Sequence, residues 1–150
     1  MSYNPYSLEG KTILVTGASS GIGKATAVEC SKLGAGVVIT GRDEKRLSDT
    51  FSLLQGDSHI QLVADLGKEE DLSLLVNRLP ALDGIAHIAG IVKTIPVTFL
   101  KKQDMQHLFD VNFFAPTLLT TGLLKQKKIR KPSSRSEERR VGKECCGGGG

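Results

Sequence analysis

Short β-branched segments alternate with longer amphipathic segments between residues 11 and 124, and no other feature of the sequence constrains the fold as strongly. Four segments are candidate strands, at 12–16, 37–40, 60–64 and 84–88. The segments between them repeat apolar residues at intervals of three and four, which is typical of helices that pack on a sheet. This alternation predicts an α/β fold in which helices cover a parallel sheet.

Two of the expected helices show which side chains should face the sheet. The residues at helical spacing are Leu47, Thr50, Phe51 and Leu54 in one helix, and Leu72, Leu75, Val76 and Leu79 in the other. Right-handed connections place the first three strands in the order 3-2-1 and the fourth beyond the first. A further helical pattern covers 102–128, and we expect no strand after it. The predicted fold is therefore a Rossmann-type doubly wound parallel sheet, truncated after four strands and the following long helix.

A glycine-rich turn, residues 16–23 (Thr-Gly-Ala-Ser-Ser-Gly-Ile-Gly), stands directly after the first strand and opens the first helix. In such a turn Gly17 permits the sharp bend, Gly21 lets a pyrophosphate approach the backbone, and Gly23 allows the helix to pack close to the sheet. The helix N-terminus presents free N–H groups to the phosphates. Ordinary turns also contain glycines, but the position between a strand and a helix favours a dinucleotide site.

This turn resembles the TGxxxGIG motif of the short-chain dehydrogenase/reductase family, and the resemblance covers most of residues 8–124. Asp65 with Leu66 matches the family's adenine-contacting Asp, and Asn112 matches the Asn of its catalytic helix. Where the family has Asn-Asn-Ala-Gly, residues 87–90 read His-Ile-Ala-Gly, and we expect His87 to bind neighbouring backbone rather than to act as a base. The resemblance implies cofactor contacts from Gly17, Ser19, Ser20, Gly21, Ile22, Gly23, Arg42, Asp65, Leu66, Ala89 and Gly90, a catalytic role for Asn112, and no metal.

The end of the second strand bears on the choice of cofactor. By resemblance Gly41 occupies the place of the family's NAD-selecting acid, and Arg42 follows it as in NADP-dependent members. A 2′-phosphate calls for arginine, so NADP is predicted rather than NAD. Asp43 is the competing ribose ligand, and we interpret it instead as the N-cap of a helix that begins at Glu44.

Asn112 and Pro116 form a pair with a physical consequence. In an α-helix the Asn112 carbonyl would accept from the N–H of residue 116, which proline lacks. In the family the Asn at this place holds a water of the proton relay through its main chain, and the helix is kinked there. Pro116 would produce that kink in this chain. The alternative is a kinked packing helix in which Asn112 is merely buried.

The family's Tyr-x-x-x-Lys is absent, because the only tyrosines are Tyr3 and Tyr6 and neither has a lysine four residues later. Ser133 and Ser134 are not assigned the role of the family's serine, which follows a later strand. We therefore interpret the chain as an inactive N-terminal fragment of an NAD(P)-dependent oxidoreductase that transfers hydride to or from a carbonyl or alcohol substrate. The alternative is a non-catalytic dinucleotide-binding or regulatory protein.

The C-terminal segment differs from the rest of the chain. Residues 125–150 hold nine Lys and Arg against three Glu, although the whole chain has a net charge of only +4. No aromatic residue follows Phe114 to stack on bases, so no nucleic-acid partner is predicted. The order of residues 135–145 matches the translation of a common sequencing-adapter oligonucleotide. We therefore expect 1–134 to be the N-terminal part of an NAD(P)-binding domain and 135–150 to be a non-native tail.

The remaining expectations concern the environment of the protein. No apolar run approaches the ~20 residues that span a bilayer, and the start lacks a signal peptide, so no membrane partner is predicted. Cys30, Cys145 and Cys146 have no metal-ligand or disulfide spacing, which fits the cytoplasm. The resemblance further implies a homo-oligomer for the intact protein.

Overall fold

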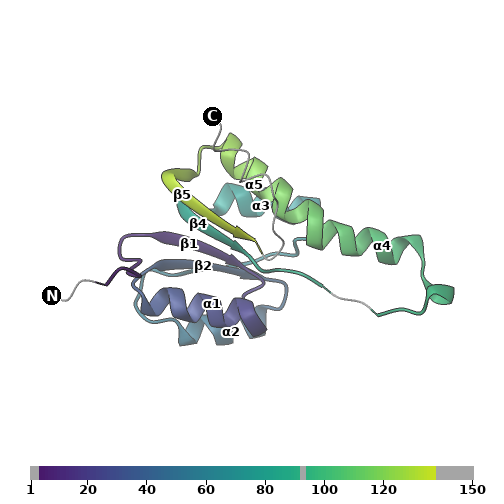
Figure 1. The fold of residues 1–150 in the computed structure, drawn as a ribbon, viewed down its shortest axis with the longest axis horizontal. Coiled ribbons are helices and arrows are strands. Elements are labelled where there is room, and N and C mark those ends of the chain that lie inside the picture. Colours follow the sequence, from purple (N-terminus) through teal and green to yellow (C-terminus); the bar gives the residue numbers. More distant parts are fainter. Residues whose placement is uncertain (1–3, 92–93, 138–150) are drawn as a thin grey trace.

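The computed structural model describes residues 4–91 and 94–137, which form a five-stranded parallel sheet with helices on both faces (Figure 1). The strand order is β3-β2-β1-β4-β5. The strands are β1 (Thr12–Thr16), β2 (Gly36–Gly41), β3 (Ile60–Val63), β4 (Leu82–His87) and β5 (Ile129–Glu137). The helices are α1 (Gly21–Lys32), α2 (Glu44–Leu53), α3 (Glu69–Arg78), the 3₁₀ turn η1 (Val97–Phe99), α4 (Lys102–Phe109), the π-helical turn η2 (Asp110–Phe114) and α5 (Ala115–Lys125).

Successive side chains of β1 and β2 alternate between two separate hydrophobic clusters. Helices α1 and α2 cover one face of the sheet, and α3 and α5 cover the other (Figure 1). Leu14 packs in the cluster beneath α3 and α5, whereas its neighbour Val15 packs in the cluster beneath α1 and α2. The predicted doubly wound α/β fold is therefore confirmed. The helix faces predicted from spacing are buried at Leu47, Thr50, Leu54, Leu72, Leu75, Val76 and Leu79, and partly buried at Phe51.

The expectation of a sheet that ends after four strands is wrong, because β5 pairs with β4 in parallel. The pairing joins Leu82 to Ile129 and, after a shift in register, residues 84–87 to 134–137. Pro132 lies in the stretch where the register shifts, and proline cannot donate to a ladder. Strand pairing at a sheet edge uses backbone groups, so β5 forms without the β-branched pattern that marks the buried strands. The first residues of the expected tail, 135–137, thus belong to the sheet.

Asp83 ties the start of β5 to the middle of the sheet. Its carboxylate accepts the Thr12 N–H at 2.8 Å and contacts the Arg130 guanidinium at 3.0 Å, and the Asp83 side chain is only 10% exposed. Lys128, just before β5, donates to the carbonyls of Val76 and Asn77 near the end of α3. These contacts place the chain that follows α5 beside β4.

The long helix expected at 102–128 is interrupted where Pro116 predicts a break. Residues 110–114 form a π-helical turn between α4 and α5, and the Ala115 N–H donates to the Asp110 carbonyl five residues back. Pro116 has no N–H for the α-helical bond to the carbonyl four residues earlier. In a π turn the hydrogen bonds join residues five positions apart, so the turn does not require that bond. The break in α-helical hydrogen bonding is confirmed.

Asp43 is the N-cap of α2, as predicted from the sequence. Its Oδ1 accepts the Arg46 N–H at 3.1 Å, three residues into the helix. The same carboxylate lies 3.7 Å from the Arg46 Nε. The capping bond satisfies one of the N–H groups that a helix start leaves without partners.

We expect Asp43→Ala to lower the free energy of unfolding by about 1 kcal/mol, because it removes the cap. Asp43→Ser keeps a capping oxygen and removes the charge, so it should retain most of the stability. Urea denaturation with an unchanged m-value measures both. An equal loss in the two variants would contradict the capping explanation and assign the stability to the exposed ion pair with Arg46.

Candidate functional site

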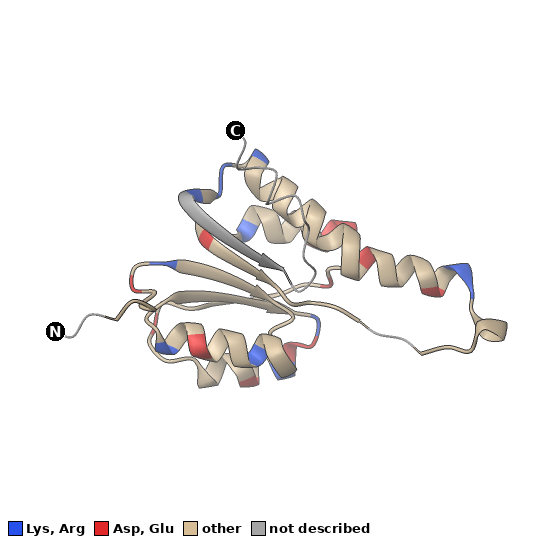
Figure 2. Cartoon of the chain, in the orientation of Figure 1, with Lys and Arg blue, Asp and Glu red and all other residues tan. Residues whose placement is uncertain are grey.

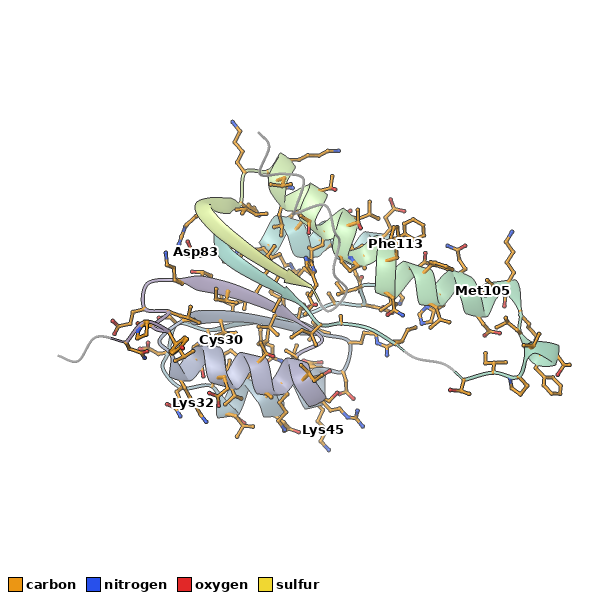
Figure 3. The ribbon with its side chains drawn as sticks, in the orientation of Figure 1. Cys30, Lys32, Lys45, Asp83, Met105 and Phe113 are labelled. Atoms are coloured by element: carbon orange, nitrogen blue, oxygen red, sulfur yellow. The ribbon has the colours of Figure 1, made fainter. Side chains whose placement is uncertain are left out.

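A cleft of about 1610 Å³ opens at the carboxyl ends of the strands. The glycine turn and the ends of β2, β3 and β4 form its sheet side, and α4, η2 and α5 form the opposite wall, where Figure 3 labels Met105 and Phe113. The cleft spans the junction of β1 and β4, where the connections reverse direction and ligands bind in open α/β sheets. The predicted residues that line it are Gly17, Ser19, Ser20, Ile22, Gly23, Arg42, Asp65, Leu66, Ala89, Gly90 and Asn112. Gly21 is the one predicted residue that is not among them.

The glycine turn folds tightly on itself. A Cβ at Gly23 would collide with the Gly17 carbonyl oxygen. The sequence predicted that Gly23 lets the helix approach the sheet, and the backbone that it approaches is that of the turn itself. Gly17 itself has a φ of 65°, and a Cβ there would lie 2.7 Å from the Ala89 Cα. The turn therefore packs directly against the segment that follows β4.

The start of α1 is open to a ligand. Gly21 has a φ of 57°, and a Cβ built on it meets nothing within 4 Å. The Ser20 side chain makes no capping hydrogen bond. Since the first N–H groups of a helix have no intrahelical partners, the turn offers donors and space to an anion.

Thr16 and Asn112 hold the segment after β4 from its two sides. The Thr16 hydroxyl oxygen accepts the N–H groups of Ile88 and Ala89 at 3.0 and 3.1 Å. The Asn112 side chain accepts the Ile91 N–H and donates to the Ile91 carbonyl, both at 2.8 Å. Asn112 is exposed rather than buried, so the alternative of a buried packing residue is wrong.

His87 is buried at the end of β4 and lines the cleft. Its Nε2 lies 3.1 Å from the Thr120 hydroxyl oxygen, and that hydroxyl donates to the Pro116 carbonyl at 2.8 Å. Because the hydroxyl has one proton and gives it to Pro116, Nε2 is the donor toward Thr120. One partner of the His87 ring is thus a side chain on α5, in addition to the neighbouring backbone groups that the sequence predicted as its partners.

Asp65 and Leu66 lie in the loop after β3. The Asp65 Oδ1 accepts the Gly67 N–H at 2.9 Å, and the Asp65 N–H donates to the Asp71 carboxylate at 2.8 Å. Leu66 is buried with its side chain in the cluster beneath α3 and α5. The loop is thereby held in place beside the cleft.

The end of β2 places two arginines on the cleft. A Cβ at Gly41 would lie 3.2 Å from the Ser19 Oγ, so this strand end touches the glycine turn. Arg42 is exposed and lines the cleft, and so does Arg46 in the first turn of α2. Sequence reasoning missed Arg46, although its spacing of four residues from Arg42 and three from Asp43 could have indicated it.

We also searched the described part of the chain for a reactive thiol, a metal site and a membrane-spanning helix. Burial, and secondarily the charge of Glu29, raises the pKa of the Cys30 thiol, which disfavours the nucleophilic thiolate. Within residues 4–91 and 94–137, no three His, Cys, Asp or Glu side chains gather as metal ligands would. No helix in the same residues has the length and apolar character to cross a membrane.

Several known proteins resemble this chain in sequence. A family model described as short chain dehydrogenase matches residues 11–134. A 3-oxoacyl-(acyl-carrier-protein) reductase of Rickettsia prowazekii (strain Madrid E) is 37% identical over 124 residues, 83% of this chain and 51% of that protein. An uncharacterized oxidoreductase of Bacillus subtilis (strain 168) is 35% identical over 118 residues, 75% of this chain and 44% of that protein. The chain spans about half the length of these curated relatives.

Solved structures resemble it in fold as well. A short-chain dehydrogenase of Escherichia coli CFT073 complexed with NADPH has a TM-score of 0.78 and 31% identity, with coverage of 90% of this chain and 60% of that chain. A short-chain dehydrogenase of Pseudomonas syringae has a TM-score of 0.79 and 30% identity, with coverage of 91% and 60%. With a doubly wound sheet, a glycine turn at its switch point and a family match over residues 11–134, the chain belongs to the short-chain dehydrogenase family.

Proposed function

We propose that this chain is the NADP-binding part of an oxidoreductase that transfers hydride between a nicotinamide cofactor and a carbonyl or alcohol substrate. The observation that carries the proposal is the single cleft that gathers the glycine turn, Arg42, the Ala89-Gly90 segment and Asn112. The dinucleotide would supply the hydride. The protein's own residues would bind and orient it.

The glycine turn fits the pyrophosphate. The space beside Gly21 and the unpartnered N–H groups at the start of α1 suit two phosphates that must approach backbone closely. Ser19 and Ser20, which line the cleft at this point, add hydroxyl donors. Ala89 and Gly90, held by Thr16, would border the dinucleotide where it crosses from β1 to β4.

Arg42 supports NADP rather than NAD. Its exposed guanidinium lines the cleft, and guanidinium groups bind phosphate with paired N–H donors. The competing acid, Asp43, is already occupied as the N-cap of α2 and as the partner of Arg46. The relative from Escherichia coli that was solved with NADPH agrees with this choice.

Asn112 would act through its main chain. Its side chain is bound to the Ile91 backbone through both its oxygen and its nitrogen, so we assign the water of a proton relay to the main-chain carbonyl at the π turn. The chain has no Tyr-x-x-x-Lys to exchange a proton with a substrate. We therefore propose that it binds dinucleotide without turnover, and the same absence favours the second candidate, a non-catalytic dinucleotide-binding or regulatory protein.

The setting of the intact protein follows from the same proposal. It would act in the cytoplasm on a small carbonyl or alcohol compound, as a homo-oligomer and without a nucleic-acid or membrane partner. Cysteines without metal or disulfide spacing support the reducing compartment.

Residues 135–150 are proposed to be foreign to the gene, and the end of the family match at Ser134 supports this. Amplification of the locus from source DNA should therefore give a different sequence after codon 134. We expect it to encode a strand, a serine and then Tyr-x-x-x-Lys. A genomic sequence that encodes residues 135–145 followed by a stop would instead establish the non-catalytic alternative.

Arg42→Asp should reverse the preference between NADPH and NADH. The aspartate would repel the 2′-phosphate and accept a hydrogen bond from the free ribose hydroxyl. Hydrogen bonds to charged groups contribute about 1.5–3 kcal/mol, so the ratio of the two dissociation constants should change at least tenfold in favour of NADH. Calorimetry measures both constants, and an unchanged ratio would refute the assignment of Arg42.

Gly21→Ala should weaken NADPH and NADH together, because its methyl group would fill the space proposed for the pyrophosphate. Alanine in the left-handed region costs about 1–2 kcal/mol of stability, so the variant should remain folded. Gly10→Ala is the matched control, since Gly10 also has a positive φ and an open Cβ position but lies before β1, outside the glycine turn. Equal binding by the two variants would place the pyrophosphate elsewhere.

A further inference from the structure

Arg46 is a second basic group at the edge of the cleft where Arg42 lies. It comes from the first turn of α2, and both arginines line the cleft with Ser19. Basic and acidic segments alternate where β2 leads into α2 (Figure 2). The resemblance to the family assigned Arg42 but gave Arg46 no role.

Asp43 holds Arg46 at both its backbone and its side chain. The Asp43 carboxylate accepts the Arg46 backbone N–H at 3.1 Å and lies 3.7 Å from the guanidinium Nε. A guanidinium carries five N–H donors, and the Nε edge uses only one of them. Both Nη groups therefore remain available to another anion.

The ion pair between Arg46 and Asp43 is weak enough for the Arg46 guanidinium to bind a second anion as well. The Arg46 side chain is 68% exposed and that of Asp43 is 52% exposed, and exposed pairs of this kind are strongly screened by water. A phosphate monoester carries a charge of about −1.5 to −2 at neutral pH, which one guanidinium does not balance. Two arginines on one edge would balance it.

We propose that Arg46 is a second ligand of the cofactor's 2′-phosphate, positioned by Asp43 and acting with Arg42 to select NADP over NAD. This inference rests on the proposed function and extends it to a residue on a different element. NADH lacks the phosphate, so Arg46 contributes nothing to its binding. The competing interpretation is a surface arginine whose only partner is Asp43.

The test compares Arg46→Gln, Arg42→Gln and Lys45→Gln in the full 150-residue chain. Lys45 is the matched control, because it is exposed on the same turn of α2, projects away from the sheet (Figure 3) and does not line the cleft. Calorimetry gives the dissociation constants of NADPH, NADH and adenosine 2′,5′-bisphosphate, and thermal melting verifies that each variant is folded. Arg46→Lys is added to separate charge from the paired donors of a guanidinium.

Arg46→Gln should weaken NADPH and the bisphosphate about tenfold and leave NADH within about twofold. The loss should shrink as salt rises, and Lys45→Gln should have no effect. Arg46→Lys should lose part of the affinity.

An unchanged ratio of NADPH to NADH affinity in Arg46→Gln, with a changed ratio in Arg42→Gln, would overturn the role of Arg46 and leave the proposed function intact. An equal loss in Lys45→Gln would overturn it too, because it would indicate only long-range charge. If the unmodified chain binds neither NADPH nor NADH, the proposed function itself fails.

Discussion

The contact between the glycine turn and the segment after β4 determines where a ligand can lie. Thr16 accepts two backbone N–H groups from this segment, and Gly17 leaves no room for a Cβ against Ala89. The connections that follow β1 and β4 leave toward opposite faces of the sheet, and a crevice forms at such a point. Because the ends of these two strands are joined at backbone distance, the glycine turn and the ends of β2, β3 and β4 line one cleft together with residues of α4, η2 and α5.

Sequence patterns predicted those parts of the fold that depend on interactions between residues close together in the chain. The buried strands, the helix faces around Leu47 and Leu75, and the Asp43 cap follow from spacing, burial and capping within a few residues. The break near Pro116 also follows, because a missing N–H has the same effect in any helix. Strand β5 could not be predicted in this way, since its ladder depends on backbone groups of β4 and its sequence has no strand pattern.

The same distinction between local patterns and contacts of distant segments applies to the candidate site. Motif residues could be placed on the cleft from the sequence because the turn and the strand ends meet at one edge of the sheet. Their partners could not, since the bonds from Asn112 to Ile91 and from His87 to Thr120 join residues 21 and 33 positions apart. His87 shows the difference most clearly. Its residue type and strand position predicted a satisfied side chain, but the partner depends on how α5 crosses the sheet.

Asp43 connects the stability of α2 with the electrostatics of the cleft. A carboxylate at the end of β2 could accept a ribose hydroxyl, but here one oxygen caps the helix and the other faces Arg46. Releasing this carboxylate to a ligand would leave a helix N–H without a partner, which costs about as much as the hydrogen bond that the ligand would return. Because the acid is held by the helix, the charge that remains free at this edge is that of the arginines. The start of α2 thereby makes the electrostatic potential positive where a ribose substituent would lie.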